Sequence, residues 1–178
     1  MPPALLEWIS EQAVRNALMD FGSIDDIERQ GFGGFVAVST LRKSACRQIP
    51  EAPGIYLVIR LQPQPAIFLN HSTGGHFKRR EPDVTIQELQ QAWVTSAIVI
   101  YIGKATVLRN RLRSYIRFGY GEPAPHWGGR YIWQLTDAPD LLVCWKMLSD
   151  EKPADVEGQL IQEFKTRYGK RPFANLRD

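Results

Sequence analysis

The chain has 178 residues, and 22 lysines and arginines against 19 aspartates and glutamates give it a formal charge of +3 at pH 7. Apolar residues make up 44% and charged residues 23%, which is ordinary for a globular protein with a packed core and excludes a disordered chain. No run of about 18 apolar residues and no basic-then-apolar leader occurs, so we expect no membrane partner and a cytoplasmic location. The two cysteines, Cys46 and Cys144, are too few for a disulfide scaffold or a cysteine-built zinc site and are expected to be buried thiols.

The first half of the chain is expected to hold one helix and then buried strands. Residues 4–21 place apolar side chains at helical spacing, and Gly22 can end that helix. Residues 31–53 are broken by glycine and proline and close in a turn. Residues 55–59 (IYLVI) and 97–102 (AIVIYI) are dense in β-branched and aromatic side chains, which is typical of buried strands.

The remaining segments are predicted, in chain order, to form a strand, two helices, a further strand and a last helix. They cover residues 66–69, 85–93, 104–118, 141–147 and 150–168. Repeats and long linkers are both missing from the sequence. We therefore expect residues 1–50 to form an extension that packs on a core of residues 51–178, with an insertion at about 61–96.

A strand that runs into Gly103-Lys104 and then a helix first suggests a phosphate-binding loop. That motif needs a glycine five residues before its Gly-Lys pair and a Ser or Thr directly after the lysine. The corresponding positions are Ile98 and Ala105, so a phosphate-binding loop is excluded.

Two tripeptides on the expected strands point to a different class of protein. They are Gly54-Ile55-Tyr56 and Tyr101-Ile102-Gly103. With the matching segments at 103–115, 157–161 and 172–175, the chain resembles the GIY-YIG nuclease superfamily, in particular the N-terminal nuclease domain of the incising subunit of bacterial nucleotide excision repair. The resemblance implies an α/β fold of the α+β type, with a small, mostly antiparallel central sheet flanked by helices.

Two segments depart from the pattern of that superfamily. Its two signature strands are usually joined by a short hairpin, whereas here 37 residues, from 60 to 96, intervene. The interval between Glu157 and Asn175 is also stretched, by a turn at 168–171. The resemblance supplies no role for either segment, nor for residues 1–50.

If residues 104–118 form one helix, that helix has two basic faces. At about 100° per residue, Lys104, Arg111 and Tyr115 share one stripe at the margin of the core. Three arginines on the opposite side can reach solvent or the phosphate backbone of DNA: Arg109, Arg113 and Arg117.

Glu157 falls within the apolar arc of the last predicted helix. A carboxylate there costs free energy unless it is paired or coordinates a cation. A metal ion is therefore one explanation, and an ion pair with Arg111 or an escape to water is the other.

The resemblance implies a divalent-metal-dependent endonuclease that hydrolyses phosphodiester bonds of DNA. Glu157 would hold Mg²⁺ or Mn²⁺, and Tyr56 or Tyr101, with its pKa lowered by nearby positive charge, would take a proton from the attacking water. The choice between the two tyrosines stays open. Further residues would bind the phosphoryl group or shape the site: Lys104, Arg111, Tyr115 and Asn175, with Gly54 and Gly103 as structural positions of the motif.

The loop at 125–130 supplies two more candidates. His126 could meet a phosphate or donate a proton, and Arg130 could bind DNA, while the alternative is a loop pinned by Trp127. The basic run at 78–80 is expected to be solvated, with DNA contact as its alternative.

Two other functions fit the same sequence. A nucleic-acid-binding module could keep this fold without cutting, and a protein-interaction domain could use the aromatic side chains of residues 118–133. The sequence assigns no DNA substrate, oligomeric state or pathway.

Overall fold

The computed structural model describes residues 19–76 and 78–177. The helix predicted over residues 4–21 therefore lies outside the described residues, except at its last three positions. Of these, Met19 and Phe21 are buried in the core.

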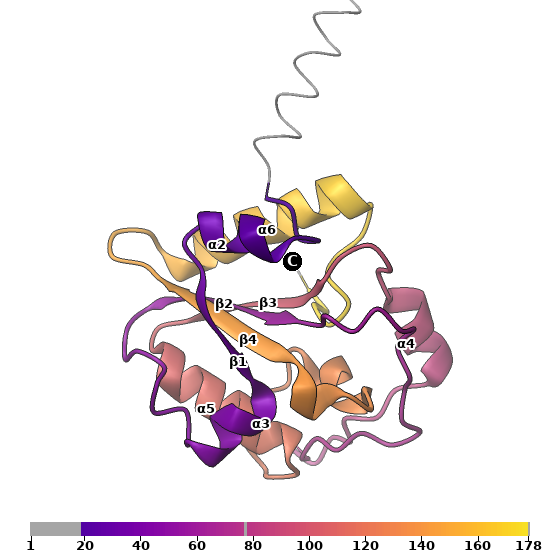
Figure 1. Ribbon diagram of the computed structural model, residues 1–178. Helices are drawn as coiled ribbons and strands as arrows, with labels where there is room; N and C mark the ends of the chain where they lie inside the picture. The colour runs from indigo at the N-terminus through magenta and orange to yellow at the C-terminus, as the bar shows by residue number, and fades with distance from the viewer. Residues whose placement is uncertain (1–18, 77, 178) are drawn as a thin grey trace, which may run out of the picture.

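The centre of the molecule is a four-stranded sheet in which every neighbouring pair of strands is antiparallel. The strands are β1 (Gly33–Ala37), β2 (Gly54–Ile59), β3 (Val99–Ala105) and β4 (Leu142–Met147). Their order across the sheet is β1-β4-β2-β3, so β3 is an edge strand (Figure 1). The predicted α+β class with a mostly antiparallel sheet is confirmed.

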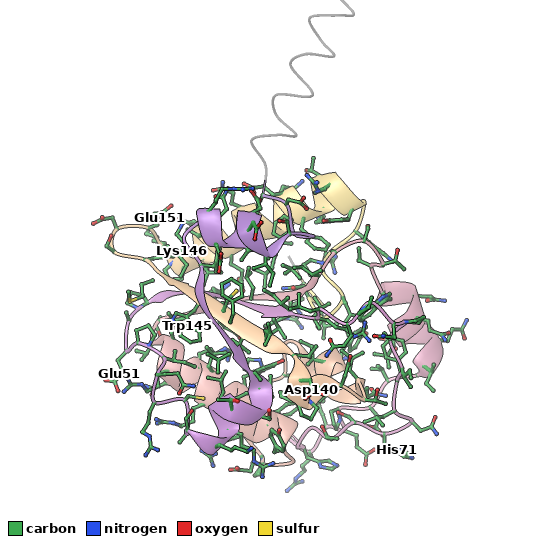
Figure 2. All side chains as sticks on the ribbon, in the orientation of Figure 1. Glu51, His71, Asp140, Trp145, Lys146 and Glu151 are labelled. Carbon is green, nitrogen blue, oxygen red and sulfur yellow. The ribbon has the colours of Figure 1, made fainter. Side chains whose placement is uncertain are left out.

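Helices cover both faces of this sheet. They are α2 (Ile24–Arg29), α3 (Val38–Lys43), α4 (Ile86–Ala92), α5 (Leu108–Gly119) and α6 (Pro153–Tyr168), with short 3-10 turns η1 (Arg130–Gln134) and η2 (Ala138–Asp140). Figure 1 shows α2 and α6 over one face and α3 and α5 over the other. Side chains fill both layers, and Glu51, His71 and Glu151 lie at the periphery (Figure 2).

Alternation along the strands sends residues into two separate cores. Ile55 and Leu57 belong to the cluster beneath α2 and α6, whereas Tyr56 and Val58 belong to the cluster beneath α3 and α5. The same period divides β3, so that Tyr101 joins the α5 side and Ile102 the α6 side.

Strand β1 was not predicted, because its strand character comes from its partner rather than from its own sequence. Gly34 and Phe35 take positive φ angles of 101° and 51°, and the register with β4 shifts between Gly33 and Val36. A Cβ on Gly34 would lie 2.6 Å from the ring of Trp145, so only glycine allows this close approach.

Several predicted elements need correction. Strand β3 continues to Ala105 and α5 begins only at Leu108, so Lys104 lies on a strand rather than on the helix. The strand predicted at 66–69 is wrong, since only one isolated bridge, Phe68 to Leu135, forms there. The helix predicted at 150–168 begins at Pro153, where a proline suits the first turn.

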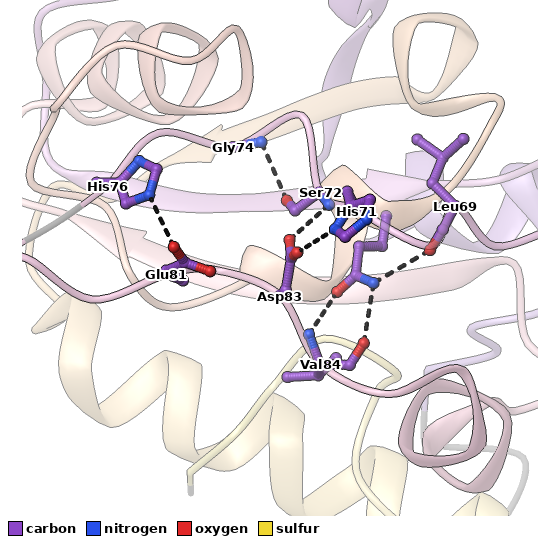
Figure 3. Close-up of polar contacts among 9 residues, drawn as sticks. Leu69, His71, Ser72, Gly74, His76, Glu81, Asp83 and Val84 are labelled. Carbon is purple, nitrogen blue, oxygen red and sulfur yellow. Dashed lines mark hydrogen bonds and ion pairs between the residues drawn. The ribbon is translucent and has the colours of Figure 1, made fainter.

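The connector between β2 and β3 is held against the rest of the chain along its length. The Leu69 amide donates to the Gln134 carbonyl at 2.7 Å, and the Gly75 amide donates to the Phe118 carbonyl at 2.7 Å. Asp83 accepts from the Ser72 amide and contacts His71, which ties residues 71–72 to residue 83 (Figure 3).

Residues 19–50 are not confined to the surface of the core. Because β1 pairs with β4, residues 33–37 are part of the central sheet, and the predicted boundary at residue 50 does not coincide with an edge of the sheet. Among the described residues, none of the helices has the length and apolar character needed to cross a membrane.

Candidate active site

A pocket of about 730 Å³ lies beside the edge strand β3. It is lined by residues of β3, α5, α6, η1 and the loop before it, the segment between β2 and β3, and the C-terminal segment. Six of the predicted site residues line it: Tyr101, Lys104, Arg111, Arg130, Glu157 and Asn175. These residues are spread over 75 positions of the sequence, and the fold brings them to one place.

The edge of the sheet explains how residues from both faces meet. Tyr101 belongs to the core beneath α5, whereas Lys104 is three positions further along β3 and reaches Glu157 on α6. At an edge strand both faces open to the same flank, so α5 and α6 can contribute to one pocket. The predicted proximity of Lys104 and Arg111 holds, although the helical argument for it was wrong.

The two candidate tyrosines differ in their access to the pocket. Tyr101 lines it with 5% of its surface exposed, whereas Tyr56 is fully buried behind it, with the ring centroids 5.9 Å apart. Tyr115 is also fully buried, and its ring stacks on that of Tyr101 at 6.4 Å. Tyr115 is thus a core residue, and of the three only Tyr101 reaches the pocket.

In the protein alone, the pKa of neither candidate tyrosine is lowered. Burial raises the pKa of Tyr101, and the opposing positive charge of Arg111 does not overcome it. Burial also raises the pKa of Tyr56 and of Tyr115 well above the ordinary value. All three side chains are therefore neutral phenols at pH 7 in the protein alone.

Arg111 extends from α5 into the pocket without a carboxylate within ion-pair distance among the described residues. It donates to the Pro125 carbonyl at 3.5 Å and also interacts with the side chains of Tyr56 and Tyr101. Because no described carboxylate neutralises it, the positive charge of the guanidinium is available to an anionic ligand.

Glu157 is the one carboxylate that lines the pocket among the described residues. It forms an ion pair with Lys104, and 15% of its side chain is exposed. The two alternatives weighed for it, pairing with Arg111 and full exposure to water, are both replaced by this pair.

A tightly held metal ion does not fit the described residues, in which no group of three or more His, Cys, Asp and Glu side chains could hold one. A hydrated Mg²⁺ ion does fit, because that ion keeps most of its waters and commonly takes one carboxylate plus phosphate oxygens. Glu157 would be the carboxylate, and its partner Lys104 would then be released toward the phosphate.

His126 does not reach the pocket, contrary to the sequence prediction. It is fully buried, its ring lies edge-on to Tyr115 at 4.7 Å, and neither ring nitrogen meets hydrogen-bond geometry with the described protein atoms. Burial and the charge of Arg111 hold its pKa well below 6.5, so the ring is neutral. A neutral ring beneath the pocket cannot protonate a substrate directly.

Asn175 uses its amide group on the backbone of β3. Its Oδ1 accepts from the Ile102 amide at 2.9 Å, and its Nδ2 donates to the Ile102 carbonyl at 2.8 Å. The Ala174 amide also donates to the Ile100 carbonyl, so the C-terminal segment covers the edge of the sheet. Asn175 is accordingly a positioning residue that fixes the strand bearing Tyr101.

The three outer arginines of α5 lie away from the pocket, as the two-face prediction requires. Arg109 pairs with Glu51, Arg117 pairs with Glu122, and Arg113 donates weakly to the Ala45 carbonyl at 3.4 Å. Their contact with DNA stays a prediction.

Both motif glycines stand where a side chain would collide. A Cβ on Gly54 would lie 2.2 Å from the Lys146 carbonyl oxygen, and one on Gly103 would lie 2.4 Å from the Tyr56 ring. The motif therefore allows β2, β3 and β4 to approach closely beneath the pocket.

Sequence reasoning missed two arginines of the pocket, Arg80 and Arg177. Arg80 belongs to the basic run at 78–80, for which DNA contact was only the alternative. Neither position carries a periodic or motif signal, because its approach to the pocket depends on the path of the chain. With Lys104, Arg111 and Arg130, they give five basic side chains around one carboxylate among the described residues.

Comparisons of the chain with family models, with curated proteins and with solved structures found no match.

Proposed function

We propose that the protein is a divalent-metal-dependent endonuclease that hydrolyses phosphodiester bonds of DNA in the pocket beside β3. The observation that carries the proposal is the convergence of Tyr101, Arg111 and Glu157, which the sequence resemblance selects independently, on one basic pocket. A pocket with five basic side chains and one carboxylate suits a phosphodiester and a hydrated cation better than a neutral substrate.

The roles of the side chains follow from their places. Arg111 and Lys104 hold the phosphoryl oxygens and stabilise the negative charge that grows on them in the transition state. Tyr101 first releases its proton to solvent, and its phenolate oxygen then accepts a proton from the attacking water. The water oxygen forms the new bond to phosphorus, and the leaving oxygen departs and takes a proton from solvent. A bound Mg²⁺ would supply a Lewis acid for the phosphoryl and leaving oxygens.

The non-cleaving nucleic-acid-binding module is the second candidate. It is favoured by one observation, the ion pair in which Lys104 already neutralises Glu157. In that function the basic pocket would bind a phosphate backbone and no metal would be needed.

Incubation of supercoiled plasmid with Mg²⁺ or Mn²⁺ separates the two candidates. We expect the wild-type chain to nick the plasmid and Glu157→Gln to bind DNA but not to cut it. Glu151→Gln is the matched control, because Glu151 is an exposed carboxylate outside the pocket (Figure 2) and should leave cleavage unchanged.

A wild-type chain that binds but never nicks would establish the binding module instead. Cleavage by Glu157→Gln at the wild-type rate would contradict the metal-holding role, provided that circular dichroism shows both variants folded.

A further inference from the structure

The pocket beside β3 continues at both ends into other pockets. It shares Lys104 and Arg111 with one of about 620 Å³ that extends toward Lys152, just before α6. It shares Tyr131 and Asn175 with another of about 500 Å³ that extends toward the turn after α6. The three pockets adjoin through these shared residues and are together called the groove, with Glu157 in the pocket that borders the other two.

The charge of this groove differs sharply from that of the whole chain. Among the described residues, nine lysines and arginines line it, together with one carboxylate, Glu157. The whole chain carries 22 basic and 19 acidic side chains, so an even distribution would place nearly as many acids as bases in the groove. Such a one-sided stripe is what a polyanion requires.

The groove receives basic side chains from the two segments that depart from the superfamily pattern. Arg80 comes from the connector between β2 and β3, and Lys170 comes from the turn that lengthens the interval after Glu157. The Lys170 ammonium donates to the Gln91 carbonyl at 3.1 Å, which directs it along the groove wall.

Arg80 follows a turn of the chain. Lys78 and Arg79 both take left-handed φ angles, of 51° and 61°, and so turn the chain directly before Arg80. The segment after Arg80 is held by Asp83 with His71 and Ser72, and by Gln134, which bonds both backbone groups of Val84 (Figure 3). Among the described residues Arg80 has no carboxylate within ion-pair distance, so its charge is available to a ligand.

We propose that this groove binds one polynucleotide strand on both sides of the bond to be cut, with Lys152 toward one end, Lys170 toward the other and Arg80 in the central pocket. The proposal rests on the proposed function in one respect, since the strand is the substrate of the central pocket. A strand carries one phosphate per nucleotide, so it can meet basic side chains all along the groove, which a mononucleotide cannot. The connector and the long turn are then strand-binding segments.

The test is DNA binding without metal, so that no cleavage occurs, by the full chain and the double variant Arg80→Ala/Lys170→Ala. We expect the double variant to bind an oligonucleotide of about ten nucleotides about tenfold more weakly, and its salt slope to fall by about 1.5. Lys170→Ala alone should leave the affinity for a dinucleotide unchanged, because that ligand fills only the central pocket, which Lys170 does not line.

The matched control is Lys43→Ala/Arg47→Ala. It removes the same two residue types from exposed positions outside the groove, where neither has a described ion pair. Affinity and salt slope of this control should equal those of the wild type.

Equal weakening by both double variants, or wild-type binding by Arg80→Ala/Lys170→Ala, would overturn the groove proposal even if Glu157-dependent cleavage persists. Competition by polyglutamate as strong as by DNA would also overturn it, in favour of an acidic protein partner. Groove-dependent binding without any cleavage would support the groove proposal and contradict the proposed endonuclease activity.

Discussion

Two opposing effects act on the pKa of the Tyr101 hydroxyl group. Burial raises its pKa and the positive charge of Arg111 lowers it, with burial the stronger of the two. A tyrosine that acts as a base must therefore lose its proton against an unfavourable equilibrium at pH 7. The fraction of phenolate then limits the rate of the chemical step.

We predict that the single-turnover cleavage rate rises about tenfold per pH unit from about pH 7 to about pH 9, because the pKa of Tyr101 lies above this range. Tyr101→Phe should abolish the cleavage activity, and with it the rise of the rate with pH. Rapid-quench measurements at saturating DNA give the profile. A rate that does not change with pH, in a reaction limited by chemistry, would exclude Tyr101 as the base.

The arginines of α5 provide a second comparison between single residues. Arg111 lines the pocket, whereas Arg113 is exposed on the opposite side of the helix. We predict that Arg111→Ala lowers the cleavage rate at saturating DNA by about 10²- to 10³-fold, as the loss of a transition-state contact does. Arg113→Ala should keep the wild-type rate, and equal effects of the two variants would refute the assignment of Arg111.

The sequence was sufficient for some residues of the site and not for others. Tyr101, Arg111 and Glu157 were predicted because their chemistry stands out in a local motif or on an apolar helix face. His126 was misplaced because nothing local shows that its loop folds beneath Tyr115. Arg80 and Arg177 reach the pocket only through the tertiary path of the chain.

At the scale of elements, the close contact between β2 and β3 depends on residue 103 being a glycine, which has no side chain. Tyr56 pairs in register with Gly103, and its ring lies where a Cβ of residue 103 would be. The helix α6 offers the opposite case, since a Cβ on Gly158 would meet nothing within 4 Å.

These two glycines should respond to the same substitution with opposite signs. We predict that Gly103→Ala lowers the free energy of unfolding by about 1–3 kcal/mol through overpacking. Gly158→Ala should raise it by about 0.5–1 kcal/mol, because alanine restricts the unfolded chain and favours the helix. Urea unfolding measures both, and a stable Gly103→Ala would show that the Tyr56 ring can move aside.

The accuracy of the predicted elements followed the strength of their local signals. The runs at 55–59 and 97–102 and the helices at 85–93 and 150–168 were located, because β-branched runs and caps such as Thr85 act locally. Strand β1 and the short helices α2 and α3 were missed, since pairing and packing with distant segments stabilise them.

At the scale of the whole molecule, the sequence indicated the class of fold but not the order of its strands. Local patterns show that strands exist, whereas the β1-β4-β2-β3 order depends on how two cores assemble on either face. The groove is a property of this level as well, because its basic side chains come from five separate parts of the chain.

The position of β4 between β1 and β2 has a consequence for biosynthesis. During translation β1, β2 and β3 are synthesised before β4, and β2 can pair with β3 as soon as residue 105 has emerged from the ribosome. Strand β1 has no neighbour in the sheet until residues 142–147 follow, and Glu157 and Asn175 emerge later still. The nascent chain therefore keeps β1 unpaired until residue 147 has emerged, and its pocket stays incomplete until Asn175 has followed.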